Sequence, residues 1–284
     1  MPNLRTSAIV AAALAIGLLG GCSSGSSDSS PATTETTAAA NETTTTEVAA
    51  EPLQILVSND DGYGAGGIDA LVEGLLTLDD VEVTVVAPLS QQSGQGGKET
   101  EGAVEVTDVE LPGGHPAKAV DGFPADSIRV AIDELGIEPD VVITGINEGQ
   151  NLGPLVDLSG TVGAARAAVE RGYPALASSQ GLGEDLDYST AVDLILDWVT
   201  ERRDEIAAGD LAVEVTNLNI PTCAVGEVRD LVEIDADLDG DPSVALRPSD
   251  CESEAASSEF DVDVGAFQAG FATIGVIPSE PAAG

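Results

Sequence analysis

Short apolar runs and helix-spaced apolar positions alternate along much of the chain. Runs rich in Val, Ile and Leu predict strands at 53–58, 81–87, 140–145, 174–179 and 211–220. Apolar residues at helical spacing predict helices at 67–78, 124–135, 159–172 and 187–208. Residues 103–120 predict a hairpin, the pattern weakens into acidic sequence after about 226, and a strand over 268–277 returns to the sheet. This alternation predicts an α/β fold: a Rossmann-like, mostly parallel sheet with helices on both faces, plus a C-terminal extension.

The first fifty residues differ from this domain. Arg5 precedes an apolar stretch, 8–19, which is too short to span a bilayer but typical of a signal peptide. The sequence ending at Cys22 (LGGC) resembles the lipobox of bacterial lipoproteins, and an ordinary secretory signal with a chance cysteine is the alternative. Residues 23–50 are mostly Ser, Thr, Ala, Gly and Glu, which predicts a disordered linker. We therefore expect a signal peptide at 1–22, a linker at 23–50 and one exported domain at 51–284, held at the outer face of the cell membrane by lipid on Cys22.

The charge balance excludes some partners. The chain has 10 Lys+Arg against 50 Asp+Glu and a net charge of -40. So few cations cannot form a basic patch, which argues against binding to nucleic-acid duplexes. Such acidity keeps a protein hydrated and suits a salty exterior, but compact folding then carries self-repulsion. A negatively charged substrate would need help from a metal.

Two cysteines remain besides the lipobox cysteine. They are Cys223 and Cys251. In an exported chain they are candidates for a disulfide, and two free thiols are the alternative. A zinc site is not expected, because the chain has one His and no CxxC.

Polar residues follow three of the predicted strands. Asp60 and Asp61 come after the first strand, Ser93 after the second, and Asn147 and Asn151 after the strand at 140–145. Ligands of parallel sheets bind beyond the carboxyl ends of the strands, so these side chains are expected at one edge. Their oxygens are hard ligands suited to Mg²⁺ or Mn²⁺, although an Asn-Asp-Asp-Gly stretch is also ordinary turn chemistry.

A predicted helix start lies near the same edge. Ser159, Gly160 and Thr161 open the helix at 159–172, where hydroxyls and free backbone amides can hold a phosphate. Taken together, the strand ends and this helix start indicate metal-assisted phosphoryl chemistry.

A glycine pattern offers a competing interpretation. Gly62, Gly64 and Gly67 spell G-x-G-x-x-G between a strand and a helix, as in dinucleotide-binding folds. However, the second strand ends in Ala87-Pro88, where a ribose-binding acidic residue would stand. Two carboxylates would also lie beside the incoming pyrophosphate with no lysine to compensate. A nucleotide-cofactor site is therefore disfavoured.

Several blocks of the sequence resemble the SurE family of survival 5′-nucleotidases. In order they are ILVSNDDGYGAGGI, VTVVAPLSQQSGQGG, GFPADSIRVAI, PDVVITGINEGQNLG, LSGTVGAARAA and GYPALASSQ, with VTNLNIP and VGAFQAGFATIGVIP resembling the closing segments. The resemblance implies release of phosphate from nucleoside 5′- or 3′-monophosphates with one divalent cation, Mg²⁺ or Mn²⁺. It implies metal ligands at Asp60, Asp61, Ser93 and Asn147.

The resemblance also assigns roles in the reaction. Asn151 and the turn 159–161 would line the phosphate pocket. Asp60 and Asp61 are the catalytic candidates, Asp60 as the group that orients or deprotonates the attacking water. The lone His115, in a Pro/Gly loop, is expected to be an exposed loop residue, and Asp126 is expected to cap or orient a helix.

Three features depart from the family pattern. These nucleotidases are normally cytoplasmic, whereas this chain carries an export signal. Residues 89–92 contain no basic residue, where many relatives have an Arg. In the family the region corresponding to 221–262 contributes an arm to dimer formation, but here it is short and acidic, so the resemblance leaves a homodimer open.

Two other functions compete with metal-dependent nucleotide hydrolysis. A haloacid-dehalogenase-type phosphatase needs D-x-D at the strand end, but residues 60–62 read D-D-G. A tethered nucleotide-binding lipoprotein without turnover fits the lipobox and linker equally well. Retention of every predicted metal-ligand type, and the lack of a recognisable second lobe, disfavour it.

Overall fold

A computed structural model of the chain describes residues 51–184 and 186–282. The expected signal peptide, its Cys22 and the expected linker at 23–50 lie outside these residues. Within the described part of the chain, no helix is both long enough and apolar enough to cross a membrane.

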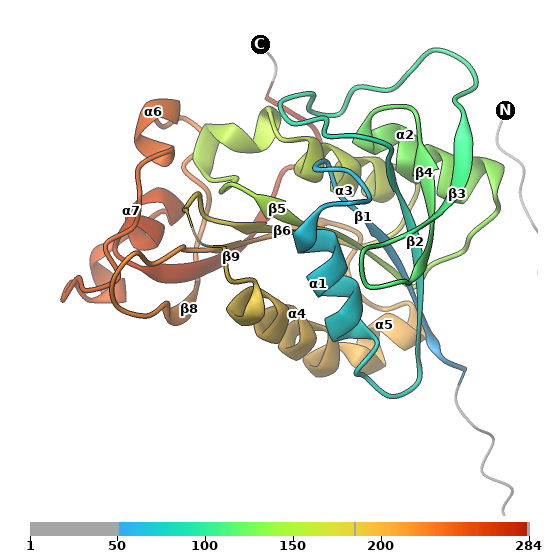
Figure 1. The fold of residues 1–284 in the computed structure, drawn as a ribbon. Coiled ribbons are helices and arrows are strands. Elements are labelled where there is room, and N and C mark those ends of the chain that lie inside the picture. Colours follow the sequence, from blue (N-terminus) through green and yellow to red (C-terminus); the bar gives the residue numbers. More distant parts are fainter. Residues whose placement is uncertain (1–50, 185, 283–284) are drawn as a thin grey trace, which may run out of the picture. The chain divides into compact units, whose positions relative to one another are not determined.

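The described residues form a nine-stranded sheet in the order β3-β4-β2-β1-β5-β6-β7-β9-β8 (Figure 1). The neighbouring strands β4, β2, β1, β5, β6 and β7 all run parallel to one another. At one end of the sheet, β3 pairs antiparallel with β4. At the other end β9 runs antiparallel to β7 and parallel to β8. The strands are β1 (Leu53–Ser58), β2 (Val81–Pro88), β3 (Val106–Glu110), β4 (Pro116–Val120), β5 (Val141–Glu148), β6 (Ala175–Gln180), β7 (Val215–Ile220), β8 (Arg229–Glu233) and β9 (Phe271–Ile277).

Helices cover both faces of the sheet. Helices α1, α4 and α5 pack on one face, and α2 and α3 pack on the other (Figure 1). The mostly parallel α/β fold expected from the sequence is confirmed. The helices and helical turns are α1 (Gly66–Leu75), α2 (Pro124–Arg129), the π-helical turn η1 (Val130–Glu134), the 3₁₀ turn η2 (Gly153–Asp157), α3 (Gly160–Glu170), α4 (Ser189–Glu201), α5 (Arg203–Ala208), α6 (Pro242–Ala245), the 3₁₀ turn η3 (Ser257–Glu259) and α7 (Asp263–Gln268).

The two faces have separate apolar cores. Strand β1 supplies both, because alternate side chains of a strand point to opposite faces. Ile55 and Val57 belong to the core under α1 and α4, while Leu56 belongs to the core under α2 and α3. Burying each such side chain stabilises the fold by about 1.5–3 kcal/mol. The double coverage fixes β1 and therefore fixes where its carboxyl end delivers Asp60 and Asp61.

Two predicted elements were too long and one was predicted as a single helix where the structure has two, each for a local reason. The helix at 67–78 ends at Leu75, and the Thr77 hydroxyl donates to the Gly74 carbonyl at 2.7 Å in the turn that follows. The helix at 187–208 is interrupted at Arg202 and continues as α5. The strand at 211–220 begins only at Val215, because Glu214 turns back onto the Ala212 carbonyl.

The segment after β7 contains more structure than its acidic sequence indicated. Strand β8 and helices α6 and α7 form there, and β9 completes the return to the sheet. The buried carboxylate of Asp263 joins this segment to the rest of the fold. It accepts from the backbone amide of Gly153 at 2.9 Å and from that of Asp237 at 2.9 Å.

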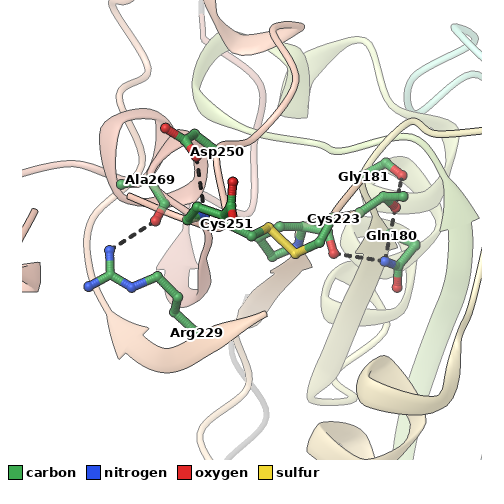
Figure 2. The surroundings of a disulfide bond; sticks show 10 residues. Gln180, Gly181, Cys223, Arg229, Asp250, Cys251 and Ala269 are labelled. Carbon is green, nitrogen blue, oxygen red and sulfur yellow. Dashed lines mark hydrogen bonds between the residues drawn. A yellow bond between two sulfur atoms is a disulfide. The ribbon is translucent and has the colours of Figure 1, made fainter. Parts of the chain in front are cut away.

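The two remaining cysteines are joined in the same segment. Cys223, just after β7, forms a disulfide with Cys251, and their Cα atoms lie 5.7 Å apart. Figure 2 shows the bond between the Gln180–Gly181 end of β6 on one side and Arg229 and Ala269 on the other. The bridge therefore fastens the C-terminal segment to the carboxyl edge of the parallel sheet.

Candidate active site

The candidate site lies at the carboxyl edge of three adjacent strands. Strands β2, β1 and β5 are neighbours in the sheet, so the loops that follow them converge. The loop after β1 is closed by Asn59, whose side-chain amide donates to the Gly62 carbonyl at 2.9 Å. The loop after β2 lies directly against it, because the backbone amide of Gln92 donates to the Asp60 carbonyl at 2.6 Å.

Asp60 is buried against the start of α3. The Thr161 hydroxyl donates to its Oδ1 at 2.6 Å, and only 2% of the residue is exposed. A Cβ atom at Gly160 would come within 2.9 Å of Asp60 Oδ2, so this glycine is required for the close approach. Burial raises the pKa of Asp60, although the Thr161 hydroxyl and the amides at the start of α3 oppose that shift. The helix start therefore holds a carboxylate before any ligand arrives.

Asp61 reaches across to β5. The backbone amide of Glu148 donates to its Oδ2 at 2.9 Å, which connects the first and third loops of the site. Burial raises the pKa of Asp61 to about 6, and the nearby carboxylates of Asp60 and Glu148 add to the rise. Carboxyl groups with raised pKa values crowded at a strand end are a common sign of a functional site, because a cation relieves the repulsion.

Asn147 and Ser93 complete the expected oxygen set. Asn147 is 6% exposed, and its amide nitrogen donates to the Gly149 carbonyl. Its Oδ1 is buried and accepts no hydrogen bond from the described residues. Ser93 is exposed and lies one residue beyond Gln92, the residue that binds the Asp60 carbonyl.

These four residues suit a hard cation. An unpartnered buried amide oxygen is costly unless a ligand completes it, and Asn147 Oδ1 is such an atom. Across the described residues, no group of three or more His, Cys, Asp or Glu side chains is placed to hold a metal. A cation here would therefore take its ligands from two carboxylates together with Ser and Asn oxygens, a set suited to Mg²⁺ or Mn²⁺.

The residues expected to bind phosphate already make hydrogen bonds within the protein. Ser159 caps α3, accepting from the Val162 amide at 3.1 Å, and the Thr161 hydroxyl is bound to Asp60. Asn151 is buried, and its side-chain amide donates to Ser179 Oγ at 2.8 Å. The turn at 159–161 thus first orients Asp60, and Asn151 is fixed from the β6 side.

Two asparagines that sequence reasoning left without a role hold the Asn151 loop. Asn219 pairs with the Asn151 backbone twice: its Oδ1 accepts from the amide at 2.7 Å and its Nδ2 donates to the carbonyl at 3.2 Å. Asn217 donates to the same carbonyl at 2.8 Å. Both side chains are buried on β7. The signal in the sequence was two asparagines at alternate positions of one strand.

A tyrosine was also missed. Tyr188 precedes α4 and packs against the start of α1, where a Cβ atom at Gly67 would lie 3.4 Å from its ring. Burial raises the pKa of Tyr188 to about 12, and the charges of Glu148 and Asp61 add to the rise. Its phenol therefore stays protonated beside the carboxylates at neutral pH.

His115 and Asp126 lie outside this cluster. His115 is half-buried in the β3–β4 turn, and its Nε2 lies 3.2 Å from the Val83 carbonyl. Asp126 stands in the first turn of α2 and accepts from the Phe123 amide at 2.9 Å. Among the hydrogen bonds and ion pairs of the described residues, no Lys or Arg contacts the four expected metal ligands.

Comparisons with known proteins agree with this architecture. A family model described as survival protein SurE matches residues 55–235. A protein named 5′-nucleotidase SurE from Brevibacillus brevis is 42% identical over 187 residues, covering 63% of this chain and 71% of that protein. A protein of the same name from Halobacterium salinarum is 44% identical over 154 residues, covering 51% of this chain and 56% of the relative, so the match spans little more than half of that protein.

A solved structure shares the fold. The SurE protein from Aquifex aeolicus is 26% identical in sequence and matches with a TM-score of 0.62. The match covers 80% of this chain and 93% of that one.

Proposed function

The chain belongs to the SurE family, and on that basis we propose that it is a 5′-nucleotidase that releases phosphate from nucleoside monophosphates. The observation that carries the proposal is the meeting of Asp60, Asp61 and Asn147 at one sheet edge, with the start of α3 against Asp60. The names of the relatives from Brevibacillus brevis and Halobacterium salinarum support the reaction. Nucleoside 5′-monophosphates are the proposed main substrates, and 3′-monophosphates are the second class.

One divalent cation, Mg²⁺ or Mn²⁺, is part of the proposal. Asp60, Asp61, Ser93 and Asn147 would hold it, because all four offer oxygen and Asn147 Oδ1 is buried without a partner among the described residues. When bound, the cation neutralises charge on the phosphoryl group and polarises the attacking water.

The protein's own residues orient this chemistry. The Thr161 hydroxyl fixes one oxygen of Asp60, so the second oxygen is available to orient the attacking water. The Glu148 amide fixes Asp61 in the same way. Asn151, held by Ser179 and Asn219, faces the phosphate, and the first turn of α3 favours negative charge beside it.

Export and anchoring complete the proposal. The lipobox-like sequence at Cys22 supports a lipoprotein that acts at the outer face of the cell membrane. A disulfide between Cys223 and Cys251 fits this location, since disulfides persist in oxidising compartments.

The test is phosphate release from 5′-AMP by the purified full chain, with Mg²⁺, with Mn²⁺ and with chelator. Asp61→Asn removes a proposed ligand at almost constant shape and should abolish metal-dependent release. The matched control is Asp108→Asn, an equal loss of charge on β3, where Asp108 pairs with Lys118. The control should keep its activity.

Two outcomes would redirect the proposal. Release that survives chelator and Asp61→Asn would rule out the cation at this site. Tight nucleotide binding with no phosphate release under any metal would favour a nucleotide-binding lipoprotein without turnover.

A further inference from the structure

A pocket opens beside the candidate active site, beyond the carboxyl ends of β6 and β7. Its volume is about 400 Å³, within the range of small-molecule sites. The residues that matter to the argument come from three segments. They are Gln180 at the end of β6, Asp187 and Thr190 at the start of α4, and Thr222, Cys223 and Glu227 after β7.

The strand register connects this pocket to the expected cation site. Glu148, whose amide holds Asp61, pairs with Gln180, and Gln180 pairs with Ile220 at the end of β7. Neighbouring strands lie about 4.8 Å apart, so β7 is roughly 10 Å from β5. A nucleoside 5′-monophosphate is long enough to place its phosphate at Asp61 and its base in the pocket.

A second connection runs through the start of α4. Tyr188 packs against Gly67 at the start of α1, just beyond the loop of Asp60 and Asp61. Its neighbours Asp187 and Thr190 line the pocket. The same short segment therefore borders the expected cation site and the pocket.

The inner wall carries an unsatisfied acceptor. Gln180 is only 3% exposed, and its Nε2 donates to the Pro221 carbonyl at 3.0 Å and to Thr222 Oγ1 at 3.1 Å. These bonds fix which side of the amide is oxygen. Its Oε1 is buried and has no partner among the described residues. Because Oε1 is enclosed by the protein, Gln180 shapes the wall of the pocket, and the groups that can meet a ligand are the carboxylates of the remaining lining.

The rest of the polar lining also consists mainly of acceptors. Asp187 and Glu227 contribute carboxylates, and no Lys, Arg or His is present among the described residues that line the pocket. The Ser189 amide donates to Asp187 Oδ1 at 2.9 Å, and the carboxylate is otherwise exposed. The Thr222 hydroxyl is already used, because it donates to the Gly181 carbonyl.

We propose that this pocket holds the nucleoside of the substrate and selects bases by the N–H groups they donate, guanine most strongly and uracil least. The inference rests on the nucleotidase function proposed above. Guanine presents a ring N–H and an amino group side by side, adenine and cytosine present an amino group, and uracil presents one N–H between two carbonyl oxygens. Uracil's oxygens would face the carboxylates of Asp187 and Glu227. Cys223, which lines the pocket, is tied to Cys251 by the disulfide (Figure 2).

The first test is binding, which requires no turnover. Titration calorimetry of the full chain with guanosine and with uridine should show about tenfold tighter binding of guanosine, the size of one charged hydrogen bond. Asp187→Asn and Glu227→Gln should each remove most of that preference. The matched control is Asp193→Asn, an exposed position on α4 outside the pocket. Glu227→Gln also serves as the second variant should Asp187→Asn fail to fold.

The second test compares hydrolysis. The kcat/KM for 5′-GMP should exceed that for 5′-UMP, mainly through KM, and the ratio should shrink in Asp187→Asn and Glu227→Gln. The control Asp193→Asn should hydrolyse p-nitrophenyl phosphate, which has no nucleoside, at the rate of the parent. Comparing 5′-GMP with 5′-dGMP separates recognition of the base from recognition of the ribose hydroxyl.

The outcomes distinguish the two proposals. Equal binding of guanosine and uridine, unchanged in the variants, would overturn the base pocket while phosphate release left the nucleotidase intact. Absence of phosphate release from every substrate would refute the nucleotidase, and a guanosine preference lost in the variants would still support the pocket.

Discussion

Removing the disulfide should lower the free energy of unfolding by an amount set by the length of the loop that the bond closes. Cys223 and Cys251 are 28 positions apart, and between them lie β8 and α6. In the double variant Cys223→Ser/Cys251→Ser this segment is no longer closed in the unfolded chain. The unfolded state gains conformations that the cross-link denied it, while the native contacts of the segment remain.

The magnitude comes from the entropy of closing a loop of that length. The chain-entropy model gives about 3.6 kcal/mol at 25 °C. The expansion of the unfolded chain should also raise the denaturant slope of the variant above that of the parent. Because domains of this kind are stable by only about 5–15 kcal/mol, the loss is a substantial part of the total.

The measurement is urea unfolding of parent and variant, with and without reductant. The parent should lose the same stability on reduction, and the variant should not respond to reductant. A loss below about 1 kcal/mol, with an unchanged slope, would refute the reasoning, because it would mean that the segment is already constrained in the unfolded state or that the bond is strained.

Three further predictions concern the site and its support. Mg²⁺ or Mn²⁺ at about 100 times its Kd should raise the free energy of unfolding of the parent and of Asp108→Asn by about 2.7 kcal/mol, measured by thermal scans. The stability of Asp61→Asn should not change. Equal shifts in all three proteins would place the cation elsewhere. Asn219→Ala should cost about 1–3 kcal/mol in urea unfolding, because it leaves the buried backbone amide of Asn151 unpaired while Asn217 still binds the carbonyl, and should lower kcat/KM for 5′-AMP about tenfold; full activity would show that Asn151 needs no such support. For Asp126, burial alone would raise the pKa, but hydrogen bonds from Thr100 and Phe123 lower it below its ordinary value of 3.8. A carboxyl group with a lowered pKa in the folded state stabilises the fold above its ordinary pKa of 3.8, and this stabilisation is lost as the pH falls through the folded-state pKa. The difference in unfolding free energy between the parent and Asp126→Asn should therefore be full at pH 7 and disappear below pH 3.8. A gap independent of pH would contradict this.

The parallel core could be predicted because its signals are local. Strands β1, β2 and β5 are rich in Val, Ile and Leu, and a glycine or polar residue lies near the end of each. Strand β8 was not predicted, because its charged composition is typical of a loop. Strand β8 contains Arg229, Asp230 and Glu233 and reads as acidic loop, yet it pairs with β9 because it lies at the open edge of the sheet, where charged residues are tolerated.

The site could be predicted as far as strand ends allow. Asp60, Asp61 and Asn147 follow apolar runs, so their edge of the sheet could be inferred. In the structure Thr161 binds Asp60, and Glu148, the residue after Asn147, binds Asp61. What could not be inferred is the support from distant segments. The pairing of Asn219 with Asn151 joins residues 68 positions apart, and no local pattern in either segment encodes that contact.

The place of β9 in the sheet has a consequence for when the protein can fold. This strand comes last in the chain, yet it lies between β7 and β8, and within the described residues β8 has no other strand neighbour. A chain still being synthesised can assemble its parallel half but cannot close this end of the sheet until residues 271–277 arrive. The export proposed above would benefit from such a delay, since the final step of folding is reserved for the complete polypeptide.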